Sequence, residues 1–398
     1  MNFFVIRYAE VGLKGKNRSW FENLLIKNIR KHIENEGESR VSRIHGRIIV
    51  ESAGEPEKVS KILHFIPGIA NFSQAVSSTH DIQEMSQQAI ELIKNHAILQ
   101  SGEGARFRIS SRRSNKKFPV KSPELSAMIG AEVLKQFPDL KVDLTDPQLD
   151  LGVEIWPENR SILYVDKIQG QGGLPSGSAG PVISMISGGI DSPVASWFAM
   201  KRGCTPIFVH FHSFPFTSEQ SQQKVVELVD QLSRYQPESV LYTIPFAEIQ
   251  KSIKSNCLEK NRTILYRRLM YQIANQLVSK YGALAYITGE ALGQVASQTM
   301  ENLACTEDAA DVPVLRPLIA MGKGEITDWA KKIGTYPISI QPFQDCCTVF
   351  QPKNPEIHGS VKMIQKDEQK LNIEELCADA LENADVQHFN THVQDKYF

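Results

Sequence analysis

Short apolar runs without polar alternation constrain the fold of this chain most strongly, because they alternate with long helical patterns over its C-terminal half. The runs are "PVISMI", "TPIFVHF", "SVLYTIPF" and "ALAYITG", which begin at residues 181, 205, 239 and 283. A strand covered on both faces has no polar side, and parallel strands are usually covered in this way. The pattern predicts a doubly wound α/β domain with a parallel sheet over residues 181–398.

The N-terminal part has a different organisation. Two cycles of strand and helix patterns, over residues 1–75 and 76–169, predict two small α+β domains. The stretch "GQGGLPSGSAG", residues 170–180, is rich in glycine and predicts a linker between these cycles and the α/β domain.

Composition excludes several classes of protein. The 398 residues carry a formal net charge of -1, and the six cysteines show no C-x-x-C or Cys/His finger spacing. Neither a zinc framework nor a secreted disulfide scaffold is indicated. The N-terminus meets charged residues too soon for a signal peptide, and no run reaches the roughly 18 apolar residues of a membrane span. We expect a cytoplasmic protein.

The segment "SGGIDS", residues 187–192, follows the first apolar run and precedes a helical pattern. Gly188 and Gly189 let a ligand approach the main chain, and N–H groups at the start of the next helix attract an anion. Ser187 and Ser192 add hydroxyl donors, so the segment predicts a phosphate-binding turn. Asp191 is interpreted as an indirect Mg²⁺ holder on a pyrophosphate, the alternative being a helix cap.

The segment "SGGIDS" resembles the pyrophosphate loop of the ATP-pyrophosphatase (PP-loop) group. Further segments resemble the tRNA 4-thiouridine synthetases (the ThiI family) over essentially the whole chain: "EVGLKGKNR", "FRISSRRSNKKFP", "VHFHSFPFT", "GEALGQVASQT", "RPLIAMGKGEI" and "DCCTVF". The resemblance implies a ferredoxin-like domain at 1–75, an RNA-binding THUMP domain at 76–169, and a PP-loop domain at 181–398.

The same resemblance implies a set of ATP-binding residues. They are Met185, Ile186, Ser187, Gly188, Gly189, Asp191, Ser192, His210, Phe211, Arg267, Gly289 and Gln298. ATP and Mg²⁺ are the implied cofactors. For His210 alone, a satisfied core histidine would be the preferred interpretation, and the neighbouring motifs favour the pocket instead.

A basic segment gives a candidate RNA surface. Residues 106–121 contain seven cations and no acid, with Phe107 and Phe118 between them; the cations are Arg106, Arg108, Arg112, Arg113, Lys116, Lys117 and Lys121. Composition alone is equally consistent with a solvated loop. The resemblance implies that the two N-terminal domains bind the tRNA acceptor end, and Lys14, Lys16 and Arg18 extend the surface.

The resemblance also implies a sulfur carrier. Aligning Asp345 with the family aspartate selects Cys347 rather than Cys346 as the catalytic cysteine, and Lys323 as the lysine that supports the site. The implied reaction adenylates O4 of uridine 8 and transfers sulfur from a Cys347 persulfide, which a cysteine desulfurase supplies. The chain ends at Phe398, so we expect the form without a rhodanese domain, and Cys204 is a possible resolving thiol.

Alternatives remain open at this point. They are a PP-loop ligase for a small molecule, a non-catalytic tRNA-binding protein, and an iron–sulfur-dependent enzyme, against which the missing C-x-x-C pair speaks. The resemblance leaves a role in sulfur supply for the thiamine thiazole possible, as it does a homodimer.

Overall fold

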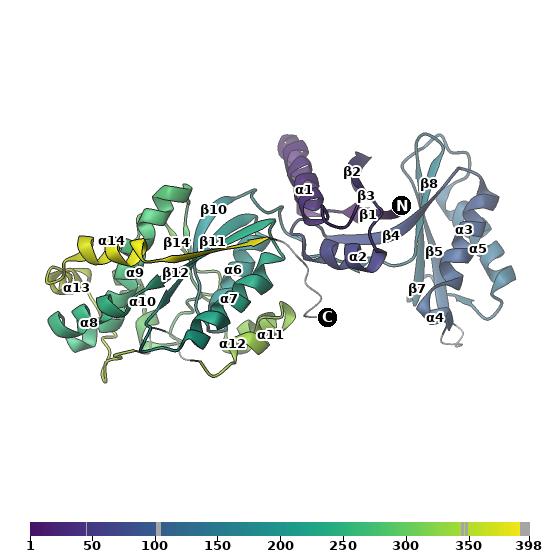
Figure 1. Cartoon of the computed structure of the whole chain (residues 1–398). Coiled ribbons are helices and arrows are strands. Elements are labelled where there is room, and N and C mark those ends of the chain that lie inside the picture. Colours follow the sequence, from purple (N-terminus) through teal and green to yellow (C-terminus); the bar gives the residue numbers. More distant parts are fainter. Residues whose placement is uncertain (45, 101–104, 344–345, 347–348, 391–398) are drawn as a thin grey trace. The chain divides into compact units, whose positions relative to one another are not determined.

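The computed structural model describes residues 1–44, 46–100, 105–343, 346 and 349–390. The chain divides into two compact units, Met1–Leu174 and a second unit that begins at Pro175 (Figure 1). The division falls inside the glycine-rich stretch 170–180. In the described ranges, no helix is long and apolar enough to cross a membrane.

The described residues of the N-terminal unit form a nine-stranded sheet in the order β2-β3-β1-β4-β8-β7-β5-β6, with β9 paired to β4. The strands are β1 (Asn2–Arg7), β2 (Ser39–Ile44), β3 (Arg47–Ser52), β4 (Asn71–Ser78), β5 (Arg106–Arg113), β6 (Lys141–Val142), β7 (Leu149–Trp156), β8 (Arg160–Tyr164) and β9 (Ile168–Gln169). The helices are α1 (Arg18–His32), α2 (Pro56–Phe65), α3 (Ile82–Lys94), α4 (Ala97–Gln100) and α5 (Ser122–Gln136).

One strand, β4, joins the two predicted N-terminal domains. Its first part pairs with β1, with Ala75 opposite Phe3, and its last part pairs with β8, with Val76 opposite Leu163. The expected boundary between residues 75 and 76 therefore lies within a strand that serves both halves of the sheet. The boundaries of the single domains stay predictions.

Helices α3 and α5 pack together over the β5–β8 half of this sheet (Figure 1). Their core includes Phe107 and Phe118, which are both buried. The sequence interpretation placed these two rings among RNA-binding cations, and the structure corrects it. Phe107 alternates inward along β5 while the arginines beside it alternate outward, as a period of two requires.

The C-terminal unit has a six-stranded sheet in its described residues, in the order β14-β13-β10-β11-β12-β15. The strands are β10 (Gly180–Met185), β11 (Cys204–His212), β12 (Glu238–Pro245), β13 (Tyr286–Ile287), β14 (Val314–Leu315) and β15 (Asp385–Asn390). The helices are α6 (Asp191–Lys201), α7 (Glu219–Ser233), α8 (Ala247–Asn256), α9 (Arg262–Tyr281), α10 (Met300–Glu307), α11 (Lys323–Lys332), α12 (Tyr336–Ser339), α13 (Val361–Glu368) and α14 (Ile373–Glu382).

Helices cover this sheet on both faces. On β10, the Ser184 hydroxyl lies within hydrogen-bond distance of the Ser196 hydroxyl of α6, at 2.7 Å. The preceding residue, Ile183, points to the opposite face and belongs to the core that contains α9. Strands β10–β14 pair in parallel, which confirms the doubly wound α/β fold. The antiparallel edge strand β15 was missed, because the sequence interpretation ended in helices.

Candidate active site

The turn between β10 and α6 is held by its own serine hydroxyls. The Ser187 N–H donates to Ser192 Oγ at 2.9 Å, and the Gly189 N–H donates to Ser187 Oγ at 3.3 Å. Ile190 precedes α6 and has no side chain that could cap the helix. The first N–H groups of α6 are therefore presented to an anion at the carboxyl end of β10.

Gly289 is required by a close approach of two backbones. A Cβ at this position would lie 2.5 Å from the backbone nitrogen of Ser192 and 2.7 Å from the backbone carbon of Asp191. The segment that follows β13 thus packs directly against the phosphate-binding turn. A side chain here would push the turn out of place, which gives a physical reason for the glycine.

A cavity of about 250 Å³ opens at the carboxyl ends of these strands. The predicted nucleotide-binding residues that line it are Met185, Ile186, Ser187, Gly189, Asp191, Ser192, His210, Phe211, Arg267, Gly289 and Gln298. Of the predicted set, only Gly188 is outside the lining. The structure therefore brings together residues that are up to 113 positions apart (298 − 185).

Two histidines on β11 are partly removed from water. His210 is buried and its Nδ1 lies 3.1 Å from the carbonyl oxygen of Ile186, at the start of the turn. Burial, with a smaller contribution from His210, lowers the pKa of His212 to about 4. His212 is therefore neutral at physiological pH. His210 is a buried histidine with a backbone partner and also a lining residue of the cavity described above.

A buried ion cluster forms one side of the cavity. Glu290 accepts from Arg267 and, at 2.7 Å, from Arg316 Nε, and its side chain is 2% exposed. Burial alone would raise the pKa of Glu290, but the two arginines outweigh it and hold the pKa below its ordinary value. The Arg267 side chain is 25% exposed and lines the cavity, so Glu290 fixes a cation where phosphates would lie.

Asp191 begins α6 and meets Lys323, the predicted supporting lysine. Lys323 Nζ lies 2.6 Å from Asp191 Oδ1, and Gln294 Nε2 donates to Oδ2 at 3.1 Å. Among the described residues there is no cluster of three or more metal-ligating side chains. One carboxylate beside a phosphate turn still fits Mg²⁺, because this ion is commonly held by one or two carboxylates together with substrate phosphates.

The cysteine segment reaches the cavity. Cys346 is buried, lines the cavity, and its carbonyl oxygen accepts from Gln250 Nε2 at 2.9 Å. Cys347 and Asp345, the predicted catalytic cysteine and its alignment marker, lie outside the described residues.

The position of Cys204 speaks against the expectation that it resolves a persulfide. Cys204 begins β11 and pairs with Gly180 at the start of β10, whereas the cavity lies at the other end of these strands. Six residues of extended chain separate Cys204 from His210, which corresponds to about 20 Å. Burial also raises the pKa of the Cys204 thiol, so the reactive thiolate is disfavoured there.

Several cavity residues were missed by the sequence interpretation. They are Val209, Met270, Tyr271, Thr288, Glu290 and Cys346 as a lining residue. Glu290 directly follows the predicted Gly289, and this adjacency was the available signal. Arg316 was quoted within a motif, but its pairing with Glu290 crosses 26 positions and has no local signature.

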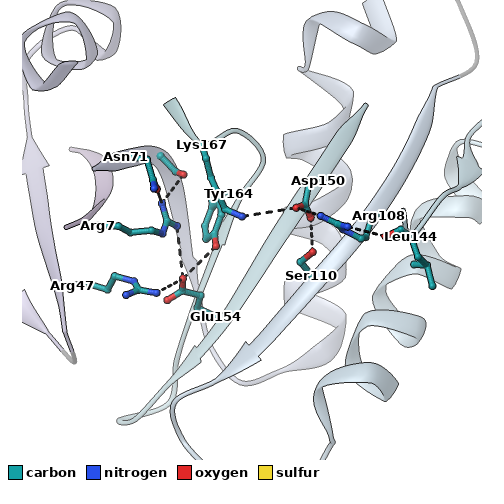
Figure 2. Close-up of polar contacts among 11 residues, drawn as sticks. Arg7, Arg47, Asn71, Arg108, Ser110, Leu144, Asp150, Glu154, Tyr164 and Lys167 are labelled. Atoms are coloured by element: carbon teal, nitrogen blue, oxygen red, sulfur yellow. Dashed lines mark hydrogen bonds and ion pairs between the residues drawn. The ribbon is translucent and has the colours of Figure 1, made fainter. Parts of the chain in front are cut away.

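The structure divides the predicted RNA-binding cations into two groups. Arg108 Nη2 lies 2.7 Å from Asp150, whose other oxygen accepts from Ser110 (Figure 2), and Arg106 lies 2.8 Å from Asp146. Arg113 donates to the carbonyl oxygen of Phe118 at 2.8 Å. The exposed cations lie at the end of β5 and in the turn that follows; they are Arg112, Lys116, Lys117 and Lys121.

A second buried glutamate joins the two halves of the N-terminal sheet. Glu154 of β7 lies between Arg47 of β3, at 3.3 Å, and Arg7 of β1, at 3.8 Å (Figure 2). Trp156 Nε1 and Tyr164 Oη also donate to it, at 3.2 and 3.3 Å. Burial acts to raise the pKa of Glu154, and the arginines lower it overall.

The C-terminal unit has a parallel sheet with a serine–glycine turn after β10. The turn faces a cavity that Arg267 and Cys346 also line. This arrangement is typical of the PP-loop class of nucleotide-binding proteins. Comparison with known families agrees along the chain. Residues 177–373 match "Thiamine biosynthesis protein (ThiI)", residues 3–73 match the ThiI ferredoxin-like domain, and residues 79–166 match the THUMP domain.

Curated relatives and a solved structure narrow the class. A probable tRNA sulfurtransferase of Natranaerobius thermophilus is 40% identical over 397 residues, covering 98% of this chain and 96% of that relative. One from a Thermoanaerobacter species is 44% identical, covering 93% and 95%. A 4-thiouridine synthetase crystallised with RNA and bound ATP superposes with a TM-score of 0.90 at 36% identity, covering 98% of this chain and all of that one. The chain belongs to the tRNA sulfurtransferase family.

Proposed function

We propose that this chain is an ATP-dependent tRNA sulfurtransferase that converts uridine 8 of tRNA to 4-thiouridine. The observation that carries the proposal is the cavity at the carboxyl ends of β10, β11 and β13, where the phosphate-binding turn, Arg267 and Cys346 meet. The family relationship and the similarity to a synthetase crystallised with RNA and ATP support it.

ATP activates an otherwise unreactive oxygen. The uracil O4 attacks the α-phosphate, the bond between the α-phosphate and the leaving pyrophosphate breaks, and the N3 proton is lost. We assign the pyrophosphate to the turn at Ser187–Ser192 and the N-terminus of α6, where no side chain caps the first N–H groups of the helix. We assign Arg267, which Glu290 holds in place, to the phosphates. We assign the adenine to the apolar part of the cavity wall, which includes Met185 and Phe211.

We assign Mg²⁺ to Asp191, where the ion would neutralise charge on the departing pyrophosphate. In the described structure the Asp191 carboxylate contacts Lys323 instead. The lysine is thereby positioned to move its charge to a phosphate or a thiolate once Asp191 has another partner. Asp191 and Lys323 therefore form one unit in the proposed reaction.

Sulfur transfer completes the substitution. The terminal sulfur of a Cys347 persulfide attacks C4 and AMP leaves, which forms a Cys347–S–S–C4 linkage. A second thiol then attacks Sγ of Cys347 and releases 4-thiouridine, and the resulting disulfide needs a dithiol reductant to start another cycle. Splitting one difficult substitution into these steps is covalent catalysis.

The exposed cations Arg112, Lys116, Lys117 and Lys121 are assigned to RNA phosphates of the acceptor end. We propose a cysteine desulfurase as the sulfur donor. We also propose that the protein is a homodimer and that it acts in the cytoplasm. Sulfur supply for the thiamine thiazole is a second proposed role, suggested by the description of the family that residues 177–373 match.

The test uses purified full-length protein with unmodified tRNA, ATP, Mg²⁺, a reductant and a persulfide source. We expect 4-thiouridine by mass spectrometry of the nucleosides, with Cys347→Ser keeping AMP transfer to tRNA but losing sulfur transfer. Cys257→Ser is the matched control, because burial raises the pKa of that thiol to about 11 and it lies outside the cavity lining. If Cys346→Ser loses sulfur transfer while Cys347→Ser keeps it, the sulfur-carrying cysteine is Cys346.

Two other results would replace the proposal. AMP formation that does not depend on tRNA would favour a PP-loop ligase for a small molecule. Tight tRNA binding without any AMP formation would leave a non-catalytic RNA-binding protein.

A further inference from the structure

Three phenylalanines and two lysines form a surface beside the cysteine segment that the proposed chemistry does not use. Phe214 and Phe216 lie in the turn after β11 and are 49% and 45% exposed. Phe350 is half-buried, and Lys251 and Lys254 of α8 are exposed. We call these five residues the Phe–Lys surface.

The Phe–Lys surface is fixed to the cavity by a short chain of hydrogen bonds. Ser213 Oγ donates to Gln250 Oε1 at 2.5 Å, and Gln250 Nε2 donates to the carbonyl oxygen of Cys346 at 2.9 Å. Cys346 lines the cavity, as does Phe211, three residues before Phe214. The three residues of this chain are buried, so the segment that carries the exposed rings is anchored to the cavity at Ser213.

Phe216, Phe350 and the two lysines contact one another. The centroids of Phe216 and Phe350 are 5.0 Å apart in an edge-on arrangement. Lys254 Nζ lies 4.1 Å from the centroid of Phe350, and Lys251 Nζ lies 5.5 Å from that of Phe216. Lys251 also pairs with Glu248 at 2.6 Å, whereas Lys254 pairs with no carboxylate of the described residues.

Phe350 keeps its place at a conformational cost. Its φ is +54°, in the left-handed region that bulky residues avoid. Such strain persists where surrounding contacts enforce it, commonly at functional sites. Phe350 lies four residues after Cys346, and in this conformation its ring packs against the ring of Phe216.

A structured RNA offers a partner that fits this chemistry. A target base inside a folded RNA must leave its stack before its C4 edge can enter a pocket, and its neighbours then lose stacking partners. Exposed aromatic rings replace that stacking without reading the sequence, and lysines beside them neutralise phosphates. The Phe–Lys surface lies beside Cys346, which lines the cavity, so nucleotides next to a base in the cavity can reach it.

We propose that the Phe–Lys surface is the docking site for the unstacked nucleotides that flank the target uridine. The inference rests on the proposed function and deepens it. It places a second RNA contact on the C-terminal unit, separate from the exposed cations of the N-terminal unit.

The test compares Phe214→Ala/Phe216→Ala and Lys254→Glu with wild-type full-length protein. Base–ring stacking is worth roughly 1–3 kcal/mol per base, so we expect kcat/KM for 4-thiouridine formation to fall about 5- to 150-fold in the double variant. ATP binding without tRNA is expected to stay unchanged. Phe216→Tyr is expected to retain activity, because the ring is kept.

Lys280→Glu is the matched control for the lysine. Lys280 lies over the rings of Tyr242 and Tyr281, at 5.3 and 5.6 Å. It is 13 residues after Arg267 on α9, or about 20 Å along the helix axis. We expect its replacement to leave tRNA turnover at the wild-type level.

A direct probe of stacking is Phe214→Trp, whose added fluorescence is expected to be quenched by unmodified tRNA. Leu284→Trp, placed at an exposed residue beside the start of β10, is expected to stay unquenched. If the wild-type protein forms 4-thiouridine and the ring and lysine variants are equally active, the inference is overturned and the proposed function stands. Absence of 4-thiouridine in the wild type would overturn the proposed function.

Two further outcomes also overturn the inference. If inorganic sulfide restores the ring variants while a protein persulfide donor does not, the surface docks the donor protein. If the ring variants lose ATP binding as well, the residues hold the cavity together and do not bind RNA.

Discussion

Glu154 and Glu290 are both buried between two arginines, one in each compact unit, yet their surroundings differ. The Glu154 cluster is closed. Arg7 also donates to Ser73 Oγ at 3.0 Å, and Trp156 Nε1 donates to the Glu154 carboxylate. Tyr164 Oη donates to the same carboxylate (Figure 2). The Glu290 cluster is open, because Arg267 lines the cavity. The same buried chemistry thus joins two half-sheets in one unit and holds a cation at the wall of a cavity in the other.

The largest effect is expected from Glu154→Gln. The change leaves Arg7 and Arg47 without their shared carboxylate, and breaking a buried ion pair from one side costs about 3–5 kcal/mol. We expect the free energy of unfolding of the N-terminal unit to fall by that amount in urea titrations. Glu51→Gln is the control, because its contact with Arg160 is longer, at 3.7 Å, and both side chains are partly exposed. Equal losses in the two variants would contradict a closed, stabilising cluster.

The next effect separates the two clusters by ligand binding. Arg267→Gln is expected to weaken ATP binding about 10- to 150-fold, the range for losing one charge-assisted hydrogen bond of 1.5–3 kcal/mol. Arg7→Gln is expected to leave ATP affinity unchanged while lowering stability. Isothermal titration with ATP measures both, and an Arg267→Gln variant with normal ATP affinity would remove the functional half of the comparison.

Most of the cavity lining could be predicted from the sequence. The turn at Ser187–Ser192 is a local structure that six consecutive residues specify, and the more distant lining residues came from the family resemblance. The partners of Arg106 and Arg108 could not be predicted, since Asp146 and Asp150 lie 40 and 42 positions away. The inward position of Phe107 was misjudged for a different reason. The alternation of Arg106, Phe107, Arg108 and Ile109 carried the signal, because a strand places alternate side chains on opposite faces, but the segment was interpreted by its charge instead.

Acid should weaken both clusters in the same direction. The pKa values of Glu154 and Glu290 lie below the ordinary value, so their stabilisation is complete above the unfolded-state pKa of about 4.3 and is lost as pH falls through the folded-state values. We therefore expect stability to decline below about pH 4.3. Glu154→Gln should flatten this decline for the N-terminal unit in pH-dependent unfolding. An unchanged pH profile in that variant would contradict the assignment.

The smallest effect concerns the exposed cations. Lys116→Gln and Lys117→Gln are each expected to weaken tRNA binding slightly and to reduce the slope of log K against log salt by roughly one, as for a lost phosphate contact. Arg106→Gln is expected to change the slope less, because this arginine already pairs with Asp146. A larger slope change for Arg106 than for the lysines would reverse the grouping.

The most direct test of the account is the stoichiometry of AMP and 4-thiouridine in one reaction with labelled ATP, unmodified tRNA and a persulfide source. The account predicts one AMP released for each 4-thiouridine formed. At an ATP concentration that just saturates the wild type, Arg267→Gln is expected to form less AMP and, in the same proportion, less 4-thiouridine. Sulfur incorporation without matching AMP release would contradict the claim that ATP turns the uracil oxygen into a leaving group.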